Sequence, residues 1–265
     1  MTVNQELQTA IIWGELVQIA YDMYEQDPIS PRVPDDFPSD WKIVATMIVE
    51  PGIKFFHKKE FIGYIAQSIH DQSHHTVIFR GTESFMDWIA DFEFILEPFQ
   101  DVPNGGKTES GFTNAYRSIT VRFVDQPSAA VPLSTTLDKL PKSASLTVAG
   151  HSLGGALATL HAVVAANRNI PVELVTFASP KVGDSTFVEA FRKGKINSKR
   201  IYNDPDKVPK VPPHLAGYEH VDEGIRINSL DFPVKHSIAC YHSLNTYLYV
   251  MGSQKLTRCS CITDK

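Results

Sequence analysis

The sequence has few cysteines, no excess of basic residues and no long apolar run. Only three cysteines occur among its 265 residues. Cys259 and Cys261 are too close in sequence to bridge comfortably, and Cys240 stands in an apolar context typical of a buried free thiol. Cys259 and Cys261 lack the second pair of ligands that a zinc site requires. The sequence therefore predicts no disulfide framework, no metal site and no other cofactor.

The charge balance argues against a nucleic-acid partner. Asp and Glu outnumber Lys and Arg by 30 to 25, which gives a net charge of -5 and a pI near 6.0. The densest basic segment, residues 192–200, is short and typical of a solvated helix end and loop. Since nucleic-acid surfaces are strongly basic, we expect no nucleic-acid binding.

No apolar stretch approaches the roughly 18 residues that a membrane span requires, so no transmembrane segment is expected. The first basic residue is Arg32, and Glu6 and Glu15 interrupt the candidate apolar run of a secretory signal. We therefore expect a cytoplasmic protein, although a secreted protein with its signal removed would look the same.

The first part of the chain predicts a helix followed by strands. Apolar residues recur at helical spacing over residues 5–26. Residues 42–49, 61–69 and 76–80 are rich in Ile, Val and Phe and predict strands. The turn at 71–75 indicates an antiparallel hairpin, and its His74 and His75 are expected to face solvent rather than bind a metal.

Beyond residue 108, after a predicted loop at 101–108, helical and strand patterns alternate. Helices are predicted at 112–123, 156–166 and 187–191, with a short helix or turn at 134–140. Strands are predicted at 146–149, 172–178 and 199–203. His161 is expected to be a core or groove histidine. The alternation indicates a mostly parallel α/β sheet with helices on both faces, extended by the antiparallel hairpin, in one domain over residues 1–265.

Between one strand and the next helix lies the pattern Gly-x-Ser-x-Gly, at residues 150–154. This context is that of a nucleophile elbow, in which a tight turn presents a serine hydroxyl, here that of Ser152. Side chains at Gly150 and Gly154 would collide with the adjacent strand and helix. The N–H of Leu153 would stand at a helix N-terminus, where partial positive charge favours an oxyanion.

A serine nucleophile needs an acid and a base, which in this fold follow it in that order. The strand at 199–203 leads to Asp204 and Asp206. Spacing leaves both open, with a slight preference for Asp206 because it lies farther into the loop. Asp184 is a third candidate, although it more readily caps the following helix.

Four histidines follow these carboxylates, and two compete for the role of base. His242 directly precedes an amphipathic helix that would anchor its imidazole, and His236 lies six residues earlier. The other two are His214 and His220.

A short amphipathic helix is predicted directly after Gly81 and Thr82. Phe85, Trp88, Ile89 and Phe92 occupy one face of it. This apolar face fits two roles: permanent packing on the core, or a mobile lid that contacts lipid when open.

In the order of its motifs, the chain resembles the class 3 lipases, a group of α/β-hydrolases that includes fungal triacylglycerol lipases and plant and bacterial acyl hydrolases. The resemblance covers roughly residues 60–250. It rests on the motifs at residues 77–82, 88–91, 111–116, 150–155, 177–183, 203–213 and 242–247. Seven motifs in the family's order form a specific signature.

The resemblance implies an α/β-hydrolase fold and a role for each motif. Ser152 becomes the nucleophile, Asp206 the orienting acid and His242 the base. Thr82 and Leu153 form the oxyanion hole, and residues 83–92 correspond to the lid helix. The family's secreted fungal members differ from this chain in their signal and disulfides, which argues against extracellular fat digestion.

These assignments imply an acylglycerol lipase or esterase that needs no cofactor, acts on lipid esters and makes transient contact with a lipid surface through its lid. A phospholipase A1 or galactolipase would use the same residues. A non-catalytic binding or signalling scaffold is a third hypothesis, which the complete set of catalytic residues argues against.

Overall fold

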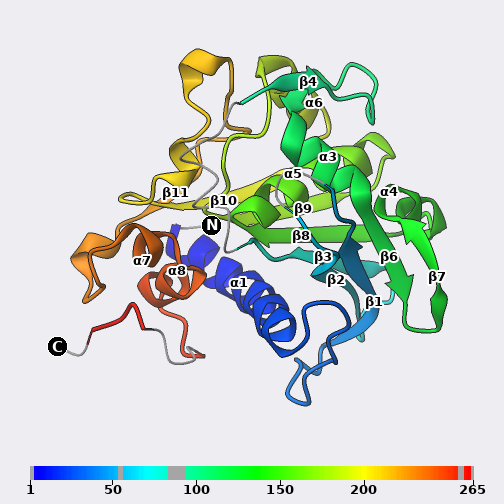
Figure 1. Cartoon of the computed structure of the whole chain (residues 1–265), viewed down its shortest axis with the longest axis horizontal. Coiled ribbons are helices and arrows are strands. Elements are labelled where there is room, and N and C mark those ends of the chain that lie inside the picture. Colours follow the sequence, from blue (N-terminus) through cyan, green and yellow to red (C-terminus); the bar gives the residue numbers. More distant parts are fainter. Residues whose placement is uncertain (1–2, 53–55, 83–93, 256–259, 264–265) are drawn as a thin grey trace.

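Figure 1 shows a computed structural model of the chain, which describes residues 3–52, 56–82, 94–255 and 260–263. The helices are α1 (Val3–Gln26), α3 (Ser110–Ser118), α4 (Leu133–Thr136), α5 (Leu153–Asn167), α6 (Ser185–Lys193), α7 (Ile238–His242) and α8 (Leu244–Met251), with 3-10 turns at Leu137–Lys139, Val208–Lys210, His214–Ala216 and Ser229–Asp231. The strands are β1 (Trp41–Val49), β2 (Glu60–Ser68), β3 (His74–Phe79), β4 (Leu96–Pro98), β5 (Lys107–Glu109), β6 (Ile119–Phe123), β7 (Gln126–Pro132), β8 (Ser145–His151), β9 (Val172–Phe177), β10 (Asn197–Asn203) and β11 (Ile225–Ile227).

Nine of these strands form one sheet in the order β11-β10-β9-β8-β3-β2-β1-β6-β7. From β3 to β11 the neighbouring strands are parallel. The predicted hairpin is present as the antiparallel pair β2–β3, and β1, β6 and β7 continue the antiparallel part. The predicted α/β fold, with a parallel centre and an antiparallel extension, is confirmed.

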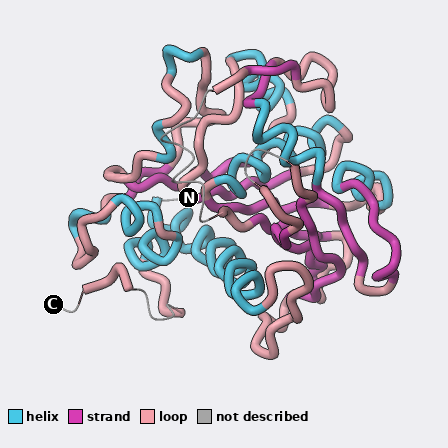
Figure 2. Tube along the Cα trace, viewed as in Figure 1, coloured by secondary structure: helices cyan, strands magenta, loops and turns pink. Residues whose placement is uncertain are grey.

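Helices cover both faces of the sheet (Figure 2). Because strand side chains alternate, Val77 and Phe79 of β3 join one core with Leu157 of α5, while Ile78 joins the other core with Val17 of α1. The long apolar helix α5 and the amphipathic helix α1 therefore lie on opposite faces of the sheet. Among the described residues, no helix has the length and apolar character that crossing a membrane would require.

The predicted helix at 112–123 is wrong in its second half. Helix α3 ends at Ser118, and the chain continues as β6, which pairs with β1. The apolar residues Ala115, Ile119 and Phe123 are four apart, a spacing that fits the period of a strand as well as that of a helix. The β-branched Ile119, Thr120 and Val121 favour the strand. The exposed edge strand β7 is not among the strands predicted from the sequence.

His74 and His75 were expected to face solvent in a turn, and this expectation is wrong. Both belong to β3, where they pair in register with the first residues of β8. His75 is buried, and His74 is half-buried with Nε2 3.0 Å from the hydroxyl of Thr147. Burial lowers the pKa of both imidazoles. Within the described ranges, neither belongs to a group of three or more side chains that could hold a metal ion.

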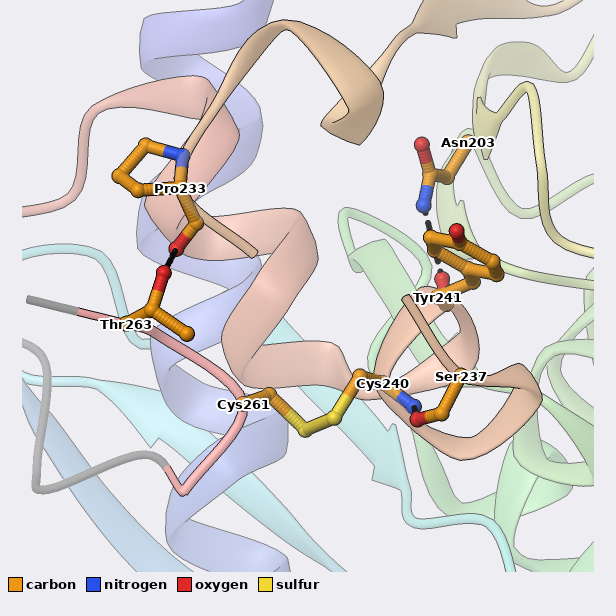
Figure 3. The surroundings of a disulfide bond; sticks show 7 residues. All are labelled: Asn203, Pro233, Ser237, Cys240, Tyr241, Cys261 and Thr263. Atoms are coloured by element: carbon orange, nitrogen blue, oxygen red, sulfur yellow. Dashed lines mark hydrogen bonds between the residues drawn. A yellow bond between two sulfur atoms is a disulfide. The ribbon is translucent and has the colours of Figure 1, made fainter. Parts of the chain in front are cut away.

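The expectation of a free thiol at Cys240 is also wrong. Figure 3 shows a disulfide between Cys240 and Cys261, whose Cα atoms are 5.2 Å apart. The two bonded cysteines are 21 residues apart in sequence, and their spacing alone does not indicate that they pair. The bond joins α7 to the C-terminal segment of the chain.

Candidate active site

Ser152 occupies the sharp turn between β8 and α5. Its backbone has φ 58° and ψ -126°, a strained conformation for a residue with a side chain. A Cβ atom on Gly150 would lie 2.2 Å from the carbonyl oxygen of Gly154, and one on Gly154 would lie 2.5 Å from that of Arg80. Only glycine fits at either position, as the sequence predicted, and the turn presents the Ser152 hydroxyl at the carboxyl edge of the sheet.

His242 and Asp206 complete a continuous chain of hydrogen bonds from Ser152. The Ser152 hydroxyl lies 2.7 Å from Nε2 of His242, and Nδ1 of His242 lies 2.8 Å from Oδ2 of Asp206. All three residues are buried. With Nδ1 donating to the carboxylate, Nε2 presents its lone pair to the serine hydroxyl. This is the arrangement that activates a serine nucleophile.

Two further donors hold the Asp206 carboxylate. The hydroxyl of the buried Tyr247 lies 2.8 Å from Oδ2, and the N–H of Val208 donates to Oδ1 at 3.0 Å. Burial and the charge of Asp206 raise the pKa of Tyr247, so its phenol remains a donor. Tyr247 belongs to the motif at residues 242–247, but the motif alone does not predict its bond to Asp206.

The competing carboxylates have other partners. Asp204 forms an ion pair with Arg226 at 2.7 Å, with both side chains largely exposed. Asp184 caps α6, where its Oδ1 accepts from the N–H of Phe187, as the sequence predicted. Neither reaches an imidazole in the described structure.

The competing histidines also lie apart from Ser152. His236 is exposed, with Nδ1 2.8 Å from the hydroxyl of Tyr241. His214 and His220 lie against main-chain carbonyl groups, those of Tyr218 and Pro209. Of these four histidines, all in the described part of the chain, only His242 joins the nucleophile to a carboxylate.

The predicted oxyanion residues flank the nucleophile. Leu153 is the first residue of α5, so its N–H belongs to the first turn, where N–H groups lack acceptors within the helix. Thr82 and His242 line the same cavity of about 320 Å³. The buried Arg80 fixes the segment before Thr82, because its guanidinium donates to the carbonyl of Gly81 at 2.6 Å and pairs with Glu60 at 2.9 Å.

His151 joins three parts of the site, a role that the sequence analysis did not identify. Its Nε2 donates to the main-chain carbonyl of His242 at 2.8 Å. Nδ1 must then accept, and the Tyr21 hydroxyl donates to it at 2.8 Å. The oxygen of Tyr21 accepts in turn from the N–H of Gly81 at 2.8 Å. Burial, followed by the charge of His242, holds the pKa of His151 well below its usual range, so this ring stays neutral.

Helix α7, which ends at His242, is fixed from two sides (Figure 3). On one side, the amide of the buried Asn203 donates to the carbonyl of Tyr241 and to the hydroxyl of Ser229. On the other, Cys240 is bonded to Cys261. The position of the imidazole thus depends on β10 and on the C-terminal segment.

The predicted lid residues Phe85, Trp88, Ile89 and Phe92 belong to segment 83–93, which lies outside the described residues.

Comparison with known proteins agrees with this geometry. The family model described as "Lipase (class 3)" matches residues 76–216, just over half of the chain. The chain belongs to the class 3 lipase family. The match includes Thr82, Ser152 and Asp206 and ends before His242. Together with the hydrogen-bond chain, it identifies a carboxylic ester hydrolase that uses a serine.

Individual relatives of this chain come from plants and fungi. Phospholipase A1-Ialpha2, chloroplastic, of Arabidopsis thaliana is 27% identical, over 99% of this chain and 68% of its own length. The lipase of Rhizomucor miehei is 33% identical, over 56% of this chain and 40% of its own length. The chain therefore spans 40% to 68% of the length of these two relatives. The structure of lipase II from Rhizopus niveus matches with a TM-score of 0.63 and 25% identity, over 84% of this chain and 80% of its own.

Proposed function

We propose that this protein hydrolyses acyl esters of neutral lipids such as acylglycerols. The observation that carries the proposal is the continuous hydrogen-bond chain from Ser152 through His242 to Asp206. A non-catalytic scaffold would have no need of a complete and buried triad.

In the first half of the reaction the serine is acylated. His242 takes the hydroxyl proton at Nε2 as the Ser152 oxygen attacks the ester carbonyl, and Asp206 stabilises the resulting imidazolium. The oxyanion is held by the N–H of Leu153 and by the N–H and hydroxyl of Thr82, each worth about 10²–10³ in turnover. The alcohol then leaves with the proton from His242.

In the second half, water replaces the alcohol. His242 removes a proton from a water molecule, which attacks the acyl-enzyme and forms a second oxyanion in the same place. Collapse of this intermediate releases the fatty acid and returns the proton to Ser152.

The cavity beside the triad supports an uncharged head group. Besides Thr82 and His242, its lining includes the side chains of Gln18, Glu25 and Asn245, and no described lining residue is Lys or Arg. A phosphate group is bound best by cationic donors, and the carboxylate of Glu25 would repel it. Amides and hydroxyls instead suit the hydroxyl groups of a glyceride.

A phospholipase A1 or galactolipase is the second candidate. It is favoured by similarity over nearly the whole chain to a plant protein named phospholipase A1. The described lining has no Lys or Arg, which argues against a phospholipid substrate. A galactolipid head group is uncharged and rich in hydroxyls, so it is compatible with this lining.

A lipid panel with the Ser152→Ala variant as control tests the proposal. Released fatty acid is measured by mass spectrometry from monoacylglycerol, diacylglycerol, phosphatidylcholine and monogalactosyl lipid. We expect glycerides and the galactolipid to be cleaved well above phosphatidylcholine, with no release by the variant. A preference for phosphatidylcholine or for the monogalactosyl lipid over the glycerides would establish the second candidate, and substantial activity in Ser152→Ala would remove Ser152 as the nucleophile.

Residues 83–92 support a proposal about the lipid surface. The apolar residues Phe85, Trp88, Ile89 and Phe92 suit a lid that opens onto a lipid surface. Hydrolysis is then expected to rise steeply when the substrate forms micelles. The same rate per accessible ester below and above the micelle concentration would contradict this.

The disulfide bears on the place of action. The sequence predicted free cysteines, which are consistent with a cytoplasmic location. The structure instead contains the disulfide Cys240–Cys261, and disulfides persist mainly in oxidising compartments. We propose such a compartment. Mass spectrometry of the native protein without reductant tests this proposal. If Cys240 were wholly reduced, the result would favour the cytoplasmic location instead.

A further inference from the structure

A second cavity lies on the α5 face of the sheet, near the amino ends of β3 and β8 and thus away from Ser152. Its volume is about 560 Å³, within the range of small-molecule sites. Its lining comes from β1, β2, β3, β6 and β8, from α5, and from residues 136–143. None of the proposed catalytic residues belongs to it.

The lining is mainly apolar and holds no carboxylate. Val44, Ile65, Val77, Leu137 and Leu146 supply aliphatic surface. Polar groups gather where the lining is exposed, at Gln72, Lys139 and Ser143. The ammonium of Lys139 lies 5.0 Å from the centre of the Phe123 ring. The cavity thus offers an apolar interior and a polar mouth.

One polar group in the buried part of the lining lacks a partner. His161 is fully buried, and its Nδ1 lies 3.1 Å from the hydroxyl of Tyr116. Its Nε2 is also buried and has no hydrogen-bond partner among the described residues. Burial, aided by the charge of Arg168, lowers the pKa of His161 to about 3, so the ring is neutral. A buried polar atom left unpaired is costly, and a ligand group that paired with it would recover that cost.

We propose that this cavity binds an uncharged amphiphile whose apolar body fills the interior and whose single hydroxyl group pairs with Nε2 of His161. A hydroxyl both donates and accepts, so it suits either tautomer of the imidazole. An amine at this depth would be buried near the positive charge of Arg168, and a carboxylate would lie away from Lys139, which is at the exposed mouth. An alkane would leave the nitrogen unpaired. An aliphatic alcohol therefore fits best, independently of any catalysis by Ser152.

The experiment measures binding of 1-octanol to the full chain by thermal shift and calorimetry. n-Octane and octanoate are the comparison ligands, and Ser152→Ala is the background variant. We expect 1-octanol to raise Tm by a few degrees in both proteins, with octane and octanoate binding at least about tenfold more weakly. His161→Phe is expected to weaken binding of the alcohol about tenfold, the loss of one hydrogen bond.

A second variant keeps the test open if His161→Phe does not fold. Leu140→Trp, at a half-buried lining position, should fill the cavity and abolish binding, whereas Leu230→Trp, at an exposed position elsewhere, should not. The proposal is overturned by equal affinity for octane, by full affinity in both lining variants, by competition with an inhibitor bound to Ser152, or by no binding at all.

Discussion

The imidazole Nε2 of His151 lies 2.8 Å from the main-chain carbonyl oxygen of His242, so the residue before the nucleophile holds the backbone of the base. The other nitrogen of His151 leads through the Tyr21 hydroxyl to the N–H of Gly81, next to Thr82. One neutral ring therefore links the nucleophile turn, the base and the oxyanion segment to helix α1.

Replacing Tyr21 with Phe should break this link. The change removes the donor to His151 and the acceptor of Gly81, and an unpaired buried group costs about 1–3 kcal/mol. We expect kcat to fall about tenfold or more, because the change disturbs the positions of the base and of the oxyanion segment. Steady-state kinetics on a p-nitrophenyl ester would measure this. Tyr202→Phe is the control, since the Tyr202 hydroxyl makes no hydrogen bond in the described structure, and equal rates for the two variants would refute the link.

The Tyr247→Phe variant should show how much the carboxylate depends on its second donor. A hydrogen bond to a charged group contributes about 1.5–3 kcal/mol, so we expect kcat to fall at least tenfold. Tyr249→Phe on the same helix is the matched control, because its hydroxyl has no hydrogen bond among the described residues. A wild-type kcat for Tyr247→Phe would show that Val208 alone orients Asp206.

The two candidate bases should differ sharply in their effect on turnover. His242→Ala removes the group that takes the serine proton and should abolish nearly all hydrolysis. His236→Ala removes an exposed ring bonded to Tyr241 and should be mild. Initial rates of both variants, with circular dichroism to verify folding, test which histidine is the base. A greater loss of activity in His236→Ala than in His242→Ala would identify His236 as the base.

The nucleophile turn could be predicted from sequence because its requirement is local. Neighbouring backbone atoms leave no room for a side chain at Gly150 or Gly154. The short Gly-x-Ser-x-Gly motif therefore indicates the turn by itself. Asp204 and Asp206 could not be separated by spacing, because both directly follow β10. The distinction comes from tertiary contacts: Asp206 turns inward to His242 and Tyr247, and Asp204 turns outward to Arg226.

Other features depended on parts of the chain far apart in sequence. The partner of Cys240 is set by the path of the C-terminal segment, which local spacing does not encode. The roles of Tyr21 and His151 require α1 to lie beside the end of β8, 130 residues away in sequence. The residues 119–123 fit both periods, and their pairing with β1 and β7 makes them a strand.

Breaking the disulfide should lower both stability and turnover. Cross-links of this kind typically stabilise a fold by about 2–4 kcal/mol, and this one also restrains the helix that ends at His242. We expect Cys261→Ser to unfold at lower denaturant concentration and to lose activity at temperatures where the wild type is stable. Cys259→Ser, which leaves both bonded cysteines in place, is the control. Identical unfolding curves for Cys261→Ser and wild type would show that the bond contributes nothing.

Two histidines outside the triad, the buried His161 and the half-buried His220, should make the fold sensitive to acid. Burial lowers the pKa of His161 and of His220 to about 3, while the unfolded chain has an ordinary histidine pKa near 6.5. Between pH 6.5 and 3 the unfolded state therefore binds protons that the folded state does not. The stability that these neutral rings contribute is complete above pH 6.5 and decreases as the pH falls towards 3.

The His220→Gln variant should reduce this acid sensitivity. Each histidine whose pKa is lowered in the folded state contributes up to about 1.4 kcal/mol per pH unit to the pH dependence of the unfolding free energy. Glutamine retains a donor for the carbonyl of Pro209 but does not bind a proton. Urea unfolding at pH 7, 6, 5 and 4 measures the slope of the unfolding free energy with pH. We expect a shallower slope for His220→Gln than for the wild type or for His236→Gln, a substitution at an exposed position. Parallel slopes for all three would show that His220 is protonated in the folded state as readily as in the unfolded one.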